Sequence, residues 1–356
     1  MSASQSDVLR VGIVGAGWMG LTHGRAWQEH AARSRIVAVA DVSTARAQAI
    51  CDQFAGGAAR IYPDLHALLA DPEVDAVDLC LPHYLHKEAI LAAAGAGKHV
   101  LCEKPLCLTL DEAREIREGL ARAGVVFMSA HNNLFAPALV EARRRLADGA
   151  LGALYYVRST EAGRNVNMKT GTPPAALAPG ESSWSWRLDP AKAGGGEVLD
   201  TGWHGAYRLL ALAGSRPIEV SAMLASFYIG QPGVEDTGVI SARFEQGALG
   251  YLLTSWAFGD PPGAFQFQVA GEQGTLGGSA TRLVMARYGQ PAEERTFEPV
   301  NTFAKEIEHF LDVVQRGVPG EATWAHAART LQLILGAYRA AAERRVVALP
   351  EDPTTL

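Results

Sequence analysis

An acid and an imidazole four positions apart, Asp200 and His204, close the segment GGGEVLDTGWH. If a helix begins near Asp200, this spacing places both side chains on one face, one turn apart. A carboxylate in that position can orient a histidine that acts as a base. The alternative is that Asp200 caps the helix of TGWHGAYRLLALAG and that His204 is a half-buried surface histidine. The segment alone leaves both interpretations open.

A second candidate for chemistry is the lysine of LCEKPL. The charged pair Glu103 and Lys104 follows an apolar, strand-like run, and Pro105 fixes the turn. A lysine at the mouth of a ligand crevice can polarise a substrate oxygen and stabilise a developing alkoxide. The alternative is a solvated Lys-Glu pair on a loop.

The segment GAGWMG predicts a dinucleotide site, because Gly15, Gly17 and Gly20 form G-x-G-x-x-G directly between an apolar strand and a helix. The first glycine allows the tight turn, the second lets the backbone approach a pyrophosphate, and the third lets helix and strand pack closely. The helix N-terminus then offers amides to the phosphates. Trp18 and Met19, in the same turn, are candidate contacts to the cofactor.

An acid at the end of the second expected strand indicates which nucleotide is preferred. Asp41 ends VAVAD, 21 positions after the last of these glycines, where a carboxylate can accept both ribose hydroxyls of adenosine. NAD is therefore the expected cofactor, since a 2′-phosphate would meet this charge. NADP is possible, because Ser43, Thr44 and Arg46 could partly offset the repulsion, and Val42 is a further candidate contact.

The loops after the later strands should face the same ligand crevice. In LCLPHYLH the imidazoles could line the cofactor, although for each of them alone a cap or a solvated surface position is equally reasonable. The candidate cofactor contacts from these loops are Leu81, Pro82, His83, His86, Glu103 and Lys104.

The elements that position these residues change character along the chain. From residue 9 to about 130, short apolar runs alternate with helical patterns, which is typical of βαβ units and a parallel sheet. Beyond residue 150, strand-length runs are joined by turns such as EQG and GEQG, which favour antiparallel hairpins, and the tail returns to helix. We predict an α/β domain over 1–130, a doubly wound Rossmann sheet, and an α+β domain over 131–356.

Composition limits the partners and the compartment. The 356 residues are 48% hydrophobic and 20% charged with a net charge of -6, so nothing suggests a nucleic-acid partner. The start MSASQSDVLR lacks the features of a secretion signal, and no run of 18 apolar residues predicts a membrane span. We expect a cytoplasmic protein with reduced thiols, and no metal site, because Cys51, Cys80, Cys102 and Cys107 lack metal-ligand spacing.

Several motifs together resemble one family. VGIVGAGWMG, VADVS, CLPHYLH, CEKPL, SWRLDPAKAGGGEVLDTGWH and GAYRAAAERRVVAL are similar, in this order and over nearly the whole chain, to the glucose-fructose oxidoreductase, inositol dehydrogenase and rhizopine catabolism (Gfo/Idh/MocA) family. The resemblance implies a Rossmann domain followed by an open-faced, mostly antiparallel sheet with helices. It also implies a substrate held between the nicotinamide and that sheet, and homodimers or homotetramers formed through the C-terminal sheets.

The resemblance also implies roles for individual residues. By position, Lys104 matches the catalytic lysine, His204 the usual acid/base, and Asp200 the carboxylate that orients the histidine or binds substrate. Trp186 and Arg187 match a Trp-Arg-x-Asp stretch beside the substrate, where an indole could stack on a sugar ring and a guanidinium could bind hydroxyls or a carboxylate. The alternative is a Trp-Arg packing pair.

Two further segments bear on the substrate. The segment SAHNNLFAP begins where the Rossmann sheet should end, so His131, Asn132 and Asn133 could face the nicotinamide or substrate, although asparagine also serves in turns. The irregular stretch 163–183 departs from more compact family members and could be a lid or an oligomer contact.

We therefore predict an NAD(P)-dependent dehydrogenase that transfers a hydride between nicotinamide and a secondary alcohol of a sugar, inositol or related polyol. In this prediction the hydroxyl lies between Lys104 and His204, and His204 takes its proton. One alternative is an enzyme that cleaves glycosides through transient oxidation by bound NAD. A non-catalytic NAD-sensing regulator is the other.

Overall fold

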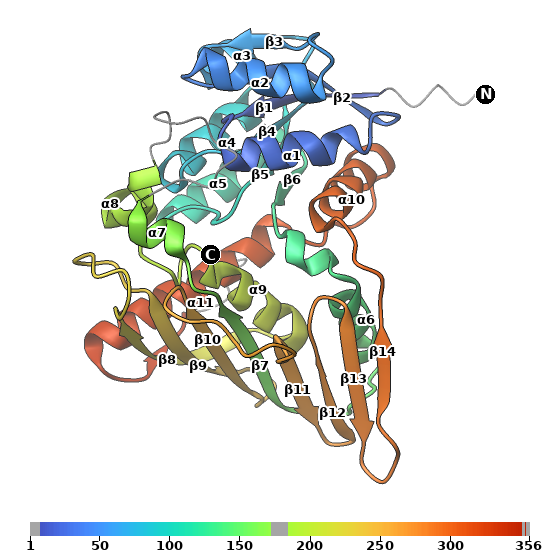
Figure 1. Cartoon of the computed structure of the whole chain (residues 1–356), viewed down its shortest axis with the longest axis vertical. Helices are drawn as coiled ribbons and strands as arrows, with labels where there is room; N and C mark the ends of the chain where they lie inside the picture. Colours follow the sequence, from blue (N-terminus) through green and yellow to red (C-terminus); the bar gives the residue numbers. More distant parts are fainter. Residues whose placement is uncertain (1–7, 172–183, 351–352, 354–356) are drawn as a thin grey trace. The chain divides into compact units, whose positions relative to one another are not determined.

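The computed structural model describes residues 8–171, 184–350 and 353, which fall into two compact units (Figure 1). Among the described residues, the first unit comprises 8–130, Trp184 and Phe303–Trp324, so the chain returns to this unit near its end. The remaining described residues belong to the second unit. The sequence prediction assigned all of 131–356 to one domain and did not anticipate this return. A helical pattern in the sequence does not indicate which sheet the helix packs against.

The first unit is built on six parallel strands in the order β3-β2-β1-β4-β5-β6. Most of their residues are apolar, as expected when both faces of a parallel sheet are covered. The order reverses between β1 and β4, where doubly wound sheets bind ligands. The strands are β1 Leu9–Val14, β2 Ser34–Ala40, β3 Arg60–Tyr62, β4 Ala76–Leu79, β5 His99–Cys102 and β6 Phe127–Ser129.

Helices between the strands complete the predicted doubly wound arrangement, which is confirmed. α1 packs beside α2 and α4 beside α5. The returning helix α10 contacts α1, where the rings of Trp27 and Phe310 meet edge to face at 6.1 Å. The helices are α1 Trp18–Gln28, α2 Thr44–Phe54, α3 Leu65–Leu69, η1 His83–Leu85, α4 His86–Gly95, α5 Leu110–Ala123 and α10 Thr302–Arg316.

The second unit contains a nine-stranded sheet in the order β14-β13-β12-β11-β7-β10-β9-β8-β15. The β7–β10 pair is parallel and the other pairs are antiparallel, so the predicted mostly antiparallel sheet and the predicted hairpins β9–β10 and β11–β12 are confirmed. The strands are β7 Leu154–Ala162, β8 Pro217–Ala225, β9 Thr237–Phe244, β10 Leu249–Ser255, β11 Phe267–Gly271, β12 Gly274–Gly278, β13 Arg282–Arg287, β14 Glu293–Thr296 and β15 Val347–Ala348.

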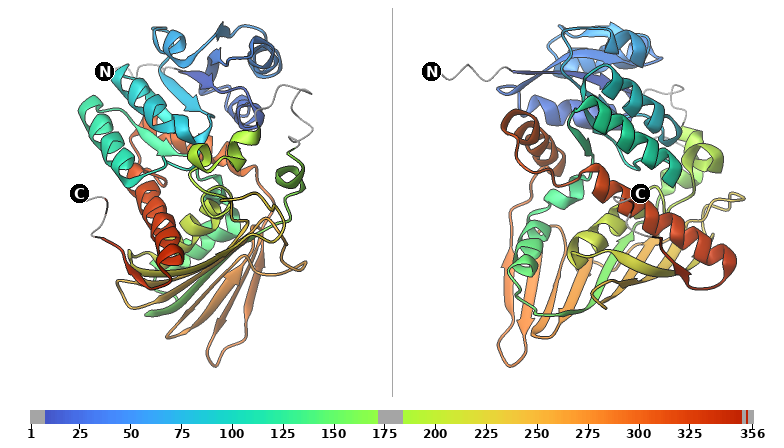
Figure 2. Two further views of the ribbon diagram at one scale, coloured as in Figure 1. Left: turned by 90° about the vertical axis from the view of Figure 1, so that its left-hand side faces the viewer. Right: turned by 180° about the vertical axis from the view of Figure 1, so that it is seen from behind.

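Helices cover one face of this second sheet (Figure 2). Strand β9 shows the resulting alternation, because Ile240 and Ala242 are buried while Ser241 and Arg243 are exposed. The long helices are α6 Pro137–Ala147, α9 Gly202–Ala213 and α11 Trp324–Glu343, and the short ones are η2 Asn132–Phe135, α7 Val166–Thr170, η3 Trp184–Leu188 and α8 Pro190–Ala193. Among the described residues, no helix is both long and apolar enough to cross a bilayer.

Candidate cofactor and active-site residues

The glycine-rich turn between β1 and α1 has the shape that a dinucleotide requires. A Cβ atom on Gly15, whose φ is 95°, would lie 2.4 Å from the Cys80 carbonyl oxygen, and one on Gly20 would lie 2.1 Å from the Gly15 oxygen. A Cβ on Gly17 would meet nothing within 4 Å, so packing within the protein does not demand this glycine. Gly17 is also the N-cap of α1, and a glycine has no side chain that could accept the free N–H groups of the first turn. An open backbone beside a helix N-terminus fits a bound pyrophosphate.

Asp41 connects the end of β2 to this turn. One carboxylate oxygen accepts the Ala16 backbone N–H at 2.7 Å, and the other accepts the Ser43 N–H at 2.7 Å. Arg46 Nη2 donates to the same carboxylate at 2.7 Å, so the charge that should reject a 2′-phosphate is partly balanced. The neighbouring Val42 is 91% exposed. These residues fit an adenosine ribose.

The loop after β4 is tied to the Glu-Lys-Pro turn through His86. This fully buried imidazole places Nδ1 2.6 Å from the Pro105 oxygen and Nε2 2.9 Å from the Leu81 oxygen. Burial lowers the pKa of His86, and a neutral ring donates to only one of these two carbonyl oxygens. His83 is also buried. The position of His86 therefore favours holding the two loops together over solvation at the surface.

Glu103 points inward from the same turn. Its carboxylate lies 3.1 Å from His23 Nε2 and accepts the Lys104 backbone N–H at 3.1 Å. The alternative of a solvated Lys-Glu pair is wrong for Glu103, which is 8% exposed. Its predicted contact with the cofactor stays a prediction. Sequence patterns did not single out His23, because its partners lie on β4 and after β5.

His23 belongs to a buried charged cluster beneath that turn. Its Nδ1 lies 2.8 Å from the Asp78 carboxylate, which also accepts the Trp27 indole N–H at 2.7 Å. Burial opposes a positive charge on His23, but the charges of and hydrogen bonds with Asp78 and Cys80 together outweigh it and raise the pKa of His23 well above its usual range. His23, Asp78 and Cys80 place potential metal-ligand atoms within 4.8 Å of one another. The hydrogen bonds from His23 and Trp27 already account for the position of Asp78.

In the second unit, the glycines before Asp200 let a turn pack against the half-buried Glu235. A Cβ on Gly195 would lie 2.1 Å from the Tyr338 hydroxyl, and one on Gly196 would lie 2.1 Å from the Glu235 carbonyl oxygen. The Glu235 carboxylate accepts N–H bonds from Gly196 and Val198 and the Tyr338 hydroxyl at 2.7 Å. Larger residues would push the turn off these groups.

Asp200 lies in the turn that this packing supports, and it does not cap the following helix. The N-cap of α9 is Thr201, without a side-chain cap bond, so the capping alternative for Asp200 is wrong. Asp200 is 6% exposed and accepts Arg187 Nε at 3.1 Å. The Arg187 guanidinium also lies 4.4 Å over the Trp186 ring. The structure thus joins three of the predicted substrate contacts in one indole-guanidinium-carboxylate group.

His204 is held from its own helix by a tyrosine that the sequence interpretation missed. The Tyr207 hydroxyl lies 2.9 Å from His204 Nδ1 and accepts the Asn133 backbone N–H at 3.2 Å. The Tyr207 ring stacks on His131 at 4.3 Å, and Trp203 Nε1 donates to His131 Nε2 at 2.9 Å. The available signal was the spacing of three between His204 and Tyr207, which places both on one helix face. A histidine held through Nδ1 uses Nε2 for proton transfer.

The irregular stretch 163–183 is described only as far as residue 171. Its first part forms the short helix α7, capped by the Asn165 side chain, which accepts the Met168 N–H at 3.1 Å. The proposed lid or oligomer contact at 172–183 lies outside the described residues.

Comparisons with known proteins match both parts of the chain to models of one oxidoreductase family. The profile of the oxidoreductase family with an NAD-binding Rossmann fold matches residues 9–131, and that of the GFO/IDH/MocA C-terminal domain matches residues 139–277. The 1,5-anhydro-D-fructose reductase of Ensifer adhaerens is 30% identical and covers 94% of this chain and 96% of its own length. Myo-inositol 2-dehydrogenase of Thermotoga maritima is 26% identical, covering 96% of this chain and 99% of its own.

Solved structures are similar over the same length. GenD2 from gentamicin A biosynthesis, solved in complex with NAD, is 26% identical with a TM-score of 0.80, covering 98% of this chain and 99% of its own. An oxidoreductase domain protein from Kribbella flavida is 25% identical with a TM-score of 0.84, covering 96% of this chain and 99% of its own.

Proposed function

Because the chain belongs to the Gfo/Idh/MocA family of oxidoreductases with an NAD-binding Rossmann fold, we propose that it oxidises a secondary alcohol of a sugar, inositol or related polyol, or runs the reverse reduction. The observation that carries the proposal is His204, held through Nδ1 by Tyr207 at 2.9 Å in a chain whose other unit carries the dinucleotide turn. A sensor of NAD would need no oriented imidazole.

In the proposed mechanism, His204 Nε2 takes the proton of the substrate hydroxyl, and Lys104 stabilises the negative charge that grows on its oxygen. A nicotinamide dinucleotide held by the Gly15–Gly20 turn and Asp41 would supply the hydride acceptor, so that an alcohol and NAD would become a ketone, NADH and a proton. Asp200 and Arg187 bind further hydroxyls and orient the substrate. Inward-facing Glu103, bonded to the Lys104 backbone, steadies the turn that carries the lysine.

Support for a carbohydrate comes from both the site and the relatives. Two relatives are named for anhydrofructose and myo-inositol, which are polyhydroxylated rings. In this chain, Asp200 balances the charge of Arg187. A neutral hydroxyl therefore suits this group better than a substrate carboxylate.

We propose NAD as the preferred cofactor, with NADP as a weaker one. Asp41 supplies acceptors for the ribose hydroxyls, and Arg46, already against that carboxylate, reduces the repulsion of a 2′-phosphate without removing it.

We propose a homodimer or homotetramer formed through the second sheet. Met223 on β8 is 75% exposed and Leu249 on β10 is 50% exposed, and both lie on the face of the sheet opposite the helices, on the two strands that flank β9. Apolar residues on an uncovered sheet face are typical of a subunit interface. A cytoplasmic location is also proposed, on the ground that Cys51, Cys80, Cys102 and Cys107 are free thiols.

The test is a spectrophotometric screen with NAD and, separately, NADP against inositols, aldoses, sugar acids and glycosides. We expect one group of compounds to reduce NAD, and we expect His204→Ala and Lys104→Ala each to lower turnover at least a hundredfold with little change in NAD affinity. Cleavage of a glycoside without accumulation of reduced cofactor would instead support the hydrolytic alternative. NAD binding with no turnover of any compound would favour the regulator.

A further inference from the structure

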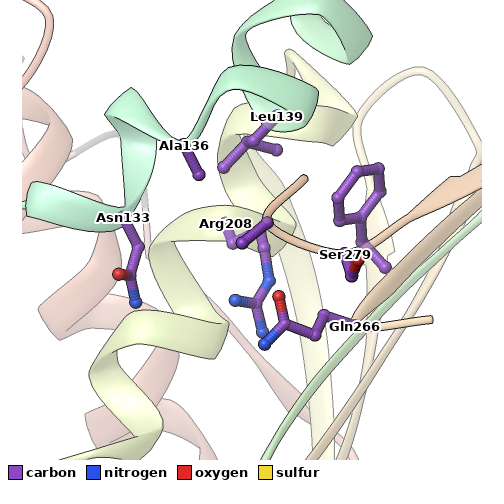
Figure 3. Close-up of a pocket in the computed structure, with 8 residues that line it drawn as sticks. Asn133, Ala136, Leu139, Arg208, Gln266 and Ser279 are labelled. Carbon is purple, nitrogen blue, oxygen red and sulfur yellow. The ribbon is translucent and has the colours of Figure 1, made fainter. Parts of the chain in front are cut away.

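We infer that a pocket inside the second unit is a subsite for the non-reacting end of the substrate and that it binds a neutral, hydroxyl-bearing group (Figure 3). The pocket has a volume of about 70 Å³ and lies among α6, α9, η2, the strand β11 and the turn between β12 and β13. The inference rests on the proposed function for its meaning, but the pocket is defined by residues of one unit only.

The polar centre of the pocket is Arg208, which is 3% exposed. Its Nε donates to the Ser159 hydroxyl at 3.0 Å, and its Nη2 donates to the Thr160 carbonyl oxygen and to Glu161 at 3.0 Å. Among the described residues, none accepts a hydrogen bond from Nη1, and this atom is not sealed from solvent. Its two N–H groups are therefore available to a molecule in the pocket.

Charge balance decides what kind of molecule fits. The Glu161 carboxylate lies 3.0 Å from the guanidinium, so the pair is close to neutral. A carboxylate bound beside it would leave a net negative charge in a mostly buried place, which is costly. A hydroxyl oxygen accepts the free N–H groups without adding charge.

The other walls suit a hydroxyl-bearing carbon. Gln266 reaches toward Arg208 in Figure 3, with Asn133 on one side and Ser279 on the other, and these side chains supply both donors and acceptors. Leu139 and Phe267 form the apolar part of the pocket wall. Polar groups set in apolar walls match the alternating hydroxyls and C–H groups of a sugar. The volume is sufficient for a hydroxymethyl group or a diol.

Asn133 connects the pocket to the proposed acid/base. Its backbone N–H donates to the Tyr207 hydroxyl at 3.2 Å, and that hydroxyl lies 2.9 Å from His204 Nδ1. Arg208 follows His204 by four positions on α9, one turn along the same helix face. A substrate whose hydroxyl meets His204 can thus place its other end against Arg208.

The first experiment needs no turnover. Binding of glycerol, a three-carbon polyol, is measured by saturation-transfer NMR on the wild type, Ala280→Leu and Ala348→Leu. Ala280 lines the pocket and is exposed, so leucine there fills the space with little cost to folding, while Ala348 is an exposed alanine on β15 outside the pocket. We expect Ala280→Leu to lose at least four-fifths of the wild-type signal and Ala348→Leu to keep it. No wild-type binding, or equal binding by all three proteins, overturns the inference.

The second experiment compares D-xylose, D-glucose and D-glucuronate, which share a pyranose ring and carry hydrogen, hydroxymethyl or carboxylate at C5. We expect the hydroxymethyl compound to have the highest kcat/KM and Gln266→Met to lower that preference about tenfold, with little effect on xylose. Gln268→Met, which lies outside the pocket, should change nothing. A preference for glucuronate, or a Gln266→Met protein with wild-type selectivity, contradicts the inference.

The two experiments separate this inference from the proposed function. If glycerol binding is lost only in Ala280→Leu while no sugar is turned over, the subsite stands and the proposed function fails. If sugars are turned over and neither pocket variant has an effect, the proposed function stands and the subsite fails.

Discussion

Tyr207 gives His204 a neutral partner, and this has consequences for the proton transfer. The hydroxyl accepts the Asn133 N–H and lies 2.9 Å from His204 Nδ1, so it can accept the proton of that nitrogen and leave Nε2 as the base. A phenol orients the ring without the added negative charge that a carboxylate would bring.

Replacement of Tyr207 by phenylalanine should therefore lower kcat by about tenfold or more while KM for NAD stays the same, since one orienting hydrogen bond is lost. The pH profile of kcat should also change, because His204 loses the contact at Nδ1. Steady-state kinetics from pH 6 to 9 measures both effects. Tyr62→Phe removes a hydroxyl bonded to Asp71 in the first unit and serves as the control. Equal kcat and an unchanged profile in Tyr207→Phe would remove the positioning role.

Asp41 is the residue on which cofactor preference should depend. Asp41→Ala removes a charged acceptor, so we expect NAD affinity to fall at least tenfold and NADP affinity to fall less. Fluorescence titration with each reduced cofactor measures the ratio. An unchanged NAD:NADP preference would separate Asp41 from cofactor selection.

Many of the residues that position these groups could not be predicted from the sequence. The glycine turn, Asp41, Lys104 and His204 were visible because each lies in a short motif. The contact of His23 with Glu103 spans 80 positions, and no local pattern reports such a pair. His86 was visible as a residue, but its tie to the carbonyl of Pro105 depends on how two loops meet.

At the scale of elements, α10 carries an unusual buried acid. Glu306 is fully buried, and among the described residues neither of its carboxylate oxygens has a hydrogen-bond partner. Burial raises the pKa of Glu306 well above its usual range, and the charges of Glu103 and Asp78 act in the same direction against the opposite effect of His23. The helix thus keeps a neutral carboxyl group against the core of the first unit.

Glu306 should make the protein less stable as the pH rises. Its pKa is raised in the folded state, so its contribution is complete below the ordinary carboxyl pKa and is lost as pH rises through the raised value. Glu306→Gln should show a smaller fall in the free energy of unfolding between pH 6 and pH 9. Chemical denaturation at both values measures it, with partly exposed Glu308→Gln, two positions along α10, as control. Identical pH slopes in wild type and Glu306→Gln would contradict the assignment.

The sequence predicted the type of each element better than it predicted which strands pair with one another. The hairpins β9–β10 and β11–β12 follow from turns within a few residues. The parallel pairing of β7 with β10 joins segments about ninety positions apart, and its register depends on packing against α9. Sequence periodicity indicates which side chains share one face of such a strand, but it does not indicate which strands lie beside it.

At the scale of the whole molecule, the uncovered face of the second sheet should determine assembly. Met223→Lys places a charge where we propose a subunit interface, so the oligomer should dissociate at least tenfold more readily. Light scattering after size-exclusion chromatography measures the mass. Val346→Lys, at another exposed apolar position on the unit, is the control. A wild-type mass for Met223→Lys at low micromolar concentration would place the interface elsewhere.

The return of the chain at Phe303–Trp324 bears on the order in which the protein can mature during translation. Trp27 is 2% exposed in the finished first unit, where it meets Phe310 of α10. A ribosome that has completed the Rossmann strands must still synthesise the whole sheet β7 to β14 before α10 emerges. Until then the nascent first unit lacks the Phe310 ring that packs against this indole. An isolated fragment that ends at residue 130 should accordingly be a poor dinucleotide binder even though it contains every motif by which one is recognised.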